Sequence, residues 1–194
     1  MQVLRCGYRL RPSRPIAALY DVRSLGRSRL IIGALDPGKT GAMLILFEDG
    51  SVYVDRVPLI TRTGKKSVPD YPLWAKNWRN SIFFNSPDVW MLEHVQARPG
   101  QGVVSMFSFG KVYGFAMGAI MASSAAPVHY AAPSVWKADL GLIGFDKSRS
   151  IDLGLELVPS IAPELSRKGV TKDIRHGIAE AALLAYYCKM KIAG

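Results

Sequence analysis

The chain has little cysteine and no long hydrophobic run. Among its 194 residues only Cys6 and Cys188 are cysteines, and they stand far apart, outside any metal-binding spacing. This excludes a disulfide framework and indicates a reducing compartment. No eighteen consecutive apolar residues occur, so we expect no membrane-spanning segment. The apolar stretch at residues 115–126 predicts a core helix instead.

Acidic residues are also scarce. The chain has 15 of them against 25 lysines and arginines, which gives a net charge of +10 and a pI near 9.8. This balance favours a polyanionic partner, with nucleic acid ahead of a membrane surface. The excess is concentrated at the start, because residues 1–29 hold seven arginines and a single acid. We therefore separate a basic extension (residues 1–29), flexible or targeting, from a single globular domain (residues 30–194).

The pattern of apolar residues and turns predicts an α/β domain. Three consecutive strands at residues 30–36, 42–48 and 51–57 are separated by Pro-Gly and Asp-Gly turns, which is typical of an antiparallel meander. Strands and helices alternate afterwards, so we expect a five-stranded mixed sheet flanked by helices. The later strands are residues 89–92 and 128–130. The helices are residues 71–84, 103–122, 134–140, 147–157 and 172–190, and residues 61–70 are a polar loop.

Acidic side chains follow two of the predicted buried strands. Asp36 ends the first strand and Glu93 ends the fourth, and open α/β sheets carry their chemistry at the carboxyl ends of strands. Asp173, His176 and Glu180 share one face of the last helix. Oxygen and imidazole ligands around one point can bind Mg²⁺ or Mn²⁺, and two such ions can support phosphodiester cleavage.

Short motifs in a fixed order carry a family resemblance. They are LDPGKTG at residues 35–41, LEHV at 92–95 and HGIAEA at 176–181. With these, the chain resembles the RuvC-like branch of the ribonuclease H-like superfamily. PGQG at residues 99–102, Met106-Phe107 and PSVWK at 133–137 are similar to its phage-type members.

The resemblance implies a Mg²⁺-dependent endonuclease that resolves four-way (Holliday) DNA junctions, usually as a homodimer. Asp36 and Glu93 would be metal ligands on the first and fourth strands, and Glu180 would be the last helix acid, where the family often has Asp. Either His176 or Asp173 would fill the remaining position. Gln96 departs from the aromatic wedge that some resolvases carry there, and Phe107 and Phe109 are the alternatives.

Basic residues around the acidic edge are candidates for DNA phosphate contacts. We expect such contacts from Gln101 and from the cations Lys39, Lys65, Lys66, Arg98, Lys111 and Lys137. Gly110, Gly114 and Gly118 recur every four residues of one helix and make a smooth ridge. In this family the equivalent helix lies at the dimer contact, and packing inside the chain is the alternative.

Two other functions fit the same residues. One is a nuclease of the same fold that acts on flaps, other branched DNA or RNA–DNA hybrids. The other is a non-catalytic protein that binds branched DNA. For all three we expect a cytoplasmic location in a bacterium or a phage-infected cell, or an organelle if residues 1–29 are a transit peptide.

Overall fold

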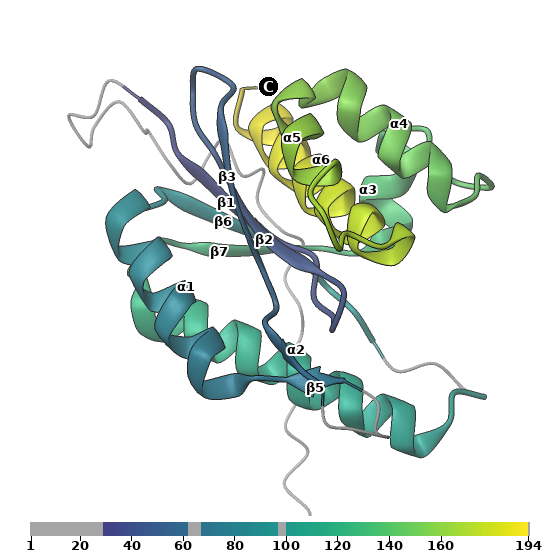
Figure 1. Ribbon diagram of the computed structural model, residues 1–194. Helices are drawn as coiled ribbons and strands as arrows, with labels where there is room; N and C mark the ends of the chain where they lie inside the picture. Colours follow the sequence, from purple (N-terminus) through teal and green to yellow (C-terminus); the bar gives the residue numbers. More distant parts are fainter. Residues whose placement is uncertain (1–28, 62–66, 97–99, 194) are drawn as a thin grey trace, which may run out of the picture.

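A five-stranded sheet lies between two layers of helices (Figure 1). The computed structural model describes residues 29–61, 67–96 and 100–193. The first three strands are β1 (Ile32–Leu35), β2 (Ala42–Leu46) and β3 (Val52–Arg56). They form the predicted antiparallel meander.

The remaining strands, β6 (Val89–Glu93) and β7 (Val128–Ala131), extend the sheet in parallel. The strand order is therefore β3-β2-β1-β6-β7, which confirms the mixed α/β sheet expected from the sequence. The register pairs Leu35 of β1 with Leu92 of β6. This pairing brings the next residues, Asp36 and Glu93, to the same edge of the sheet.

The helices divide between the two faces of the sheet. One face is covered by α1 (Tyr71–Asn85) and α2 (Val103–Ser123). The other is covered by α6 (Lys172–Ala193), with α4 (Lys147–Leu157) packed against it and α3 (Pro133–Asp139) nearby. All five predicted helices are present, with ends that differ by three residues or fewer.

Two short features escaped the sequence analysis. The predicted polar loop contains a small ribbon of β4 (Leu59–Ile60) and β5 (Val68–Pro69). A 3₁₀ turn (Pro159–Ile161) and the short helix α5 (Ala162–Leu165) connect α4 to α6. Elements of two to four residues are too short to show hydrophobic periodicity, so the sequence pattern could not separate them from loops.

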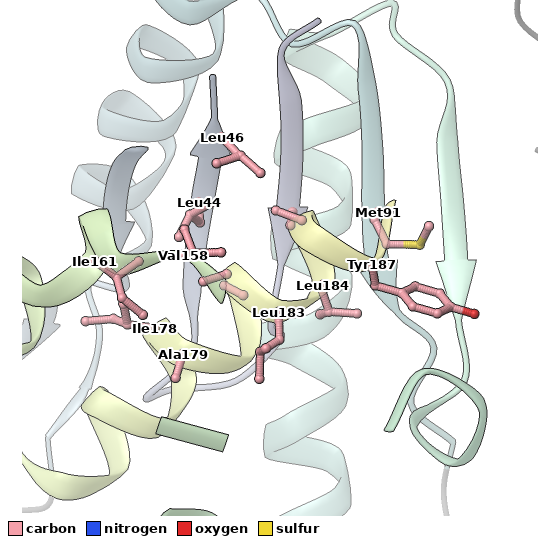
Figure 2. Packing of buried hydrophobic residues seen from close by; sticks show 14 of the residues in the cluster. Leu44, Leu46, Met91, Val158, Ile161, Ile178, Ala179, Leu183, Leu184 and Tyr187 are labelled. Carbon is pink, nitrogen blue, oxygen red and sulfur yellow. The ribbon is translucent and has the colours of Figure 1, made fainter. Parts of the chain in front are cut away.

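Each face of the sheet has its own hydrophobic core. Toward α6, Leu44 and Leu46 of β2 pack against Ile178, Leu183 and Leu184 (Figure 2). Alanines make up much of the buried face of α6, and their small side chains let the helix lie close to the strands. Toward α1 and α2, the core is aromatic: Trp74, Trp78 and Trp90 are fully buried there. The α6 side is therefore the face on which helix and strands approach most closely.

The helix α2 is mostly exposed. Its buried residues are Val112, Ala116 and Ile120. The prediction of a core helix is therefore correct for only one face of α2. Within the described part of the chain, α2 alone has the length and apolar composition needed to cross a membrane. Helices of soluble cores pass that same test, so this feature is weak evidence for a span.

The fold predicts a specific cost for a side chain at position 33. A Cβ on Gly33 would lie less than 3.0 Å from the Trp90 ring, which is fully buried and cannot move away freely. We expect Gly33→Ala to lower the free energy of unfolding by roughly 1–3 kcal/mol because it overpacks this core. Urea denaturation measures the change. Gly102→Ala, whose Cβ would make only an ordinary contact at 3.9 Å, is the control and should change stability by less than about 0.5 kcal/mol.

Candidate metal centre

Three carboxylates converge at the carboxyl edge of the sheet. Asp36 follows β1, Glu93 ends β6, and Glu180 comes from the middle of α6. One ligand atom from each lies within 4.8 Å of the other two. Glu93 and Glu180 are buried and Asp36 is partly buried. The parallel pairing of β1 with β6 places the first two carboxylates, and the packing of α6 across the sheet supplies the third.

A glycine contact brings α6 close enough to complete this cluster. A Cβ on Gly177 would lie 3.0 Å from the Asp36 carboxylate and 2.9 Å from the Cα of Gly41 in the β1–β2 turn. Any side chain there would push the helix away from the turn. Glu180 is three residues further along and shares this face. The sequence analysis did not identify Gly177, because an isolated glycine in a helical pattern has no partner until the packing is known.

The side chains of Lys137 and His176 contact Glu180. Its Oε1 lies 2.5 Å from the Lys137 Nζ and 3.2 Å from the His176 Nε2. The Ser150 hydroxyl donates to the same oxygen at 3.5 Å. Burial alone would raise the pKa of Glu180, but the hydrogen bond from His176 and the Lys137 ammonium outweigh burial and lower it. Glu180 therefore carries a negative charge at neutral pH inside the cluster.

The other two carboxyls have the opposite behaviour. Burial, then the charges of Glu180 and Glu93, raise the pKa of Asp36 well above its ordinary value. Burial and the Glu180 charge also raise the pKa of Glu93. The indole Nε1 of Trp136, which is fully buried, donates to the Glu93 Oε1 at 3.2 Å and fixes that carboxylate. Sequence reasoning missed this role of Trp136, which depends on a contact across 43 positions of the chain.

The geometry separates the two candidates for the remaining site position. His176 contacts Glu180 directly and is largely buried. Asp173 is exposed, and its carboxylate pairs with the Lys147 Nζ at 3.3 Å. Within the described residues, neither Asp173 nor His176 belongs to the group whose ligand atoms lie within 4.8 Å of one another, but His176 contacts a member of that group. The structure therefore favours His176 over Asp173 beside the three carboxylates.

This set of donors suits a hard divalent cation. Mg²⁺ and Mn²⁺ prefer oxygen ligands, and three carboxylates held by a sheet edge and a packed helix supply them. Burial and then mutual repulsion raise the pKa of Asp36 and of Glu93, and a bound cation would relieve the repulsion. Asp36, Glu93 and Glu180 are the residues that would hold it.

Comparison with known proteins adds to this geometry at the level of the fold. No protein-family model and no curated protein sequence matches the chain. A structure of RuvC from Thermus thermophilus in complex with a Holliday junction substrate is similar, with a TM-score of 0.54 and 12% sequence identity over 84% of this chain and 97% of that one. The chain has a RuvC-like fold. The phage-type resemblance of the sequence motifs stays a prediction.

Two further solved structures are similar to this RuvC-like fold. A second structure of Thermus thermophilus RuvC has a TM-score of 0.49 and 13% identity, over 83% of this chain and 96% of that chain. The yeast mitochondrial Holliday junction resolvase Ydc2 has a TM-score of 0.45 and 14% identity, over 84% of this chain and 80% of that chain. The assignment of the fold rests on the first structure and on the observed topology.

The predicted DNA-binding residues have different places in the RuvC-like fold. Lys39 is exposed in the β1–β2 turn, next to the metal centre, and Lys137 is inside it. Lys111 is exposed on α2, with its Nζ 5.8 Å from the centre of the Phe107 ring. Gln101 is exposed just before α2. Lys65, Lys66 and Arg98 lie outside the described residues, as does most of the predicted extension.

The cluster predicts that one mutation stabilises the protein while removing metal binding. Because the folded state raises the pKa of Asp36, this carboxyl favours folding below its ordinary value of 3.8, and that contribution is lost as pH rises through the raised pKa. We expect Asp36→Asn to raise the melting temperature at neutral pH in chelator by a few degrees, on the order of 1 kcal/mol.

Thermal melts over pH 4–8, with EDTA or with Mg²⁺, test this prediction. Mg²⁺ should raise the melting temperature of the wild type but not of Asp36→Asn, since binding of a cation to the folded state stabilises it. Asp173→Asn is the matched control and should keep the response to Mg²⁺. A variant Asp36→Asn that melts lower than the wild type in EDTA, or that responds to Mg²⁺ equally, would contradict the proposed cluster.

Proposed function

We propose that this protein is a metal-dependent endonuclease that cleaves four-way DNA junctions. The observation that carries the proposal is the convergence of Asp36, Glu93 and Glu180 within 4.8 Å at the carboxyl edge of a RuvC-like fold. Net charge supports a nucleic-acid substrate, because the chain carries +10 at neutral pH. The similar RuvC from Thermus thermophilus was solved with a Holliday junction as its substrate, which supports the same substrate here.

Each side chain of the centre has a distinct part in this proposal. Two Mg²⁺ or Mn²⁺ ions would be held by Asp36, Glu93 and Glu180. Such ions would orient the scissile phosphate and neutralise the charge that develops on it. Trp136 fixes the Glu93 carboxylate, and His176 donates to Glu180 and fixes its orientation. The Lys137 ammonium, 2.5 Å from Glu180, brings a positive charge to the place where the phosphate would enter.

A cleavage assay on defined substrates tests the proposed activity. Synthetic four-way junctions, flaps, RNA–DNA hybrids and linear duplexes of matched sequence are incubated with Mg²⁺, Mn²⁺ or chelator. We expect paired, symmetric nicks in the junction that require metal and fall by at least about 100-fold in Asp36→Asn, because a metal ligand is lost. Asp173→Asn, at an exposed acid outside the cluster, is the control and should retain most of the activity.

The same assay decides between the alternatives. If the protein cuts flaps or hybrids with metal but leaves the junction intact, the proposed substrate is wrong and the proposed nuclease activity is retained. Tight binding to the junction without cleavage under any metal would favour the non-catalytic branched-DNA-binding protein. Cleavage of the junction at an equal rate by Asp36→Asn would reject the proposed centre.

We infer that the protein acts as a homodimer through α2. Gly110, Gly114 and Gly118 are exposed, and no atom lies within 4 Å of a Cβ built on any of them. Phe107 and Met121, 70% and 50% exposed, stand seven residues to either side of Gly114. Two antiparallel copies of α2 that cross at Gly114 would pack Phe107 of each copy against Met121 of the other. A twofold dimer of this kind supplies two centres for two symmetric cuts.

A bulky residue at the crossing point tests the dimer. Gly114→Leu should make the protein monomeric in sedimentation equilibrium and convert paired junction cuts into single nicks, because the helices can no longer approach. Ala75→Leu, at an exposed position of α1, is the control and should leave both properties unchanged. A Gly114→Leu protein that stays dimeric and cuts in pairs would place the dimer contact elsewhere.

A further inference from the structure

A basic cavity lies beside the metal centre, on the α6 side of the sheet. Its volume is about 390 Å³. It is bounded by the β1–β2 turn, the end of β3 with the segment that follows, and the chain around the start of α6. Three of its lining residues are cations: Lys39, Arg56 and Arg167. The sequence analysis singled out neither arginine.

Strand alternation gives the cavity its charge. Side chains two apart on a strand share a face, so Arg56 lies on the same face as Val54, which packs against the core beneath α6. The one acid in the lining, Asp55, faces the other way, because its carboxylate accepts a hydrogen bond from Ser81 of α1 at 3.0 Å. Burial raises the pKa of Asp55, and the charge of the neighbouring Arg56 offsets part of that rise. The two side chains form no ion pair, so Asp55 neutralises Arg56 only in part.

The cations of the cavity are poorly paired within the described part of the chain. No described carboxylate forms an ion pair with Lys39 or with Arg56. Arg56 is only half-buried and Lys39 is exposed, so both are open to a ligand. Arg167 has one partner, Glu164 at 3.0 Å, and is itself 60% exposed. This arrangement is electropositive and suits an oxyanion, which a guanidinium can bind with two parallel hydrogen bonds.

The β1–β2 turn is the wall between this cavity and the metal centre. Asp36 is on one side of the turn, and Lys39, Thr40 and Gly41 line the cavity on the other. Lys39 is three residues after Asp36, so the Cα atoms of these two residues are at most about 11 Å apart. One strand of DNA carries a phosphate every 3.4 Å or so along the helix axis, which places the cavity within a few nucleotides of the metal centre.

We propose that this cavity binds a backbone phosphodiester of the substrate strand, a few nucleotides from the bond that is cut. The guanidinium groups of Arg56 and Arg167 bind the phosphate, and the Lys39 ammonium faces it from the β1–β2 turn. The inference rests on the proposed function, since it identifies residues that would bind the same DNA substrate. The lining of the cavity includes no residue of α2, so a dimer formed through α2 would not cover it directly.

Salt-dependent binding of a junction is the test. Binding is measured in the Asp36→Asn background with chelator, where no cleavage occurs, for Arg56→Gln, Arg167→Gln and the double variant. Each lost phosphate contact should reduce the slope of log K against log salt by about 0.9 and weaken binding roughly 3- to 10-fold near physiological salt. In the cleavage-competent protein the same changes should raise KM and leave kcat nearly unchanged.

Two further variants separate phosphate binding from structural damage. Arg56→Lys keeps the charge and should retain the wild-type slope, with a smaller loss of affinity than Arg56→Gln. Arg79→Gln, at an exposed arginine of α1 on the other layer, should change neither slope nor affinity. Unchanged slopes in Arg56→Gln and Arg167→Gln overturn the proposal, and so does an equal loss in Arg56→Lys.

The two proposals fail in different ways. If the wild type cuts junctions with metal but Arg56→Gln and Arg167→Gln leave the salt slope unchanged, the proposed phosphate site is wrong and the proposed nuclease activity is retained. If the wild type neither binds nor cuts a junction, both are overturned. Binding of inorganic phosphate that depends on Arg56 but leaves junction binding unchanged would indicate a site for free phosphate rather than for the DNA backbone, and would also overturn the proposal.

Discussion

The contact between α6 and the β1–β2 turn is the constraint on which the rest of the site depends. Gly177 has no side chain, and its backbone lies where a Cβ would be 3.0 Å from the Asp36 carboxylate. The small residues that follow on α6 continue this close approach across the sheet. Glu180 reaches Asp36 and Glu93 only because the helix is this near. The metal centre is thus a consequence of packing distance as much as of acidic residues.

The centre is electrostatically costly for the folded protein. Three carboxylates within 4.8 Å repel one another, and burial adds to the rise in the pKa of Asp36 and Glu93. Lys137 and His176 offset part of this repulsion, but both contact Glu180. Among the described residues no ion pair involves Asp36, and its pKa is raised well above the ordinary value, first by burial. Perturbed pKa values of this kind are typical of functional sites.

Cationic groups are arranged around the centre at increasing distance. Lys137 lies inside it, Lys39 stands on the turn that forms its wall, and Arg56 and Arg167 line the cavity beyond. If a DNA strand followed this path, these cations would partly neutralise its phosphates as they approach the carboxylates. The exposed glycine ridge of α2 lies on the other face of the sheet. The proposed dimer contact and the proposed DNA contact would therefore use separate surfaces.

The sequence predicted the five strands of the main sheet and the five long helices. It also singled out Asp36, Glu93 and Glu180 as candidate metal ligands. Periodicity and turn residues depend on near neighbours, and the motifs lie at strand ends or on one helix face. The two-residue strands β4 and β5 carry no such signal. The tertiary structure alone shows that His176 contacts Glu180 while Asp173 pairs with Lys147. It alone also shows that Trp136 donates to Glu93 and that the Asp55 carboxylate accepts a hydrogen bond from Ser81 while Arg56 lines a cavity. Those outcomes depend on which residues distant in sequence meet, and local pattern does not contain that information.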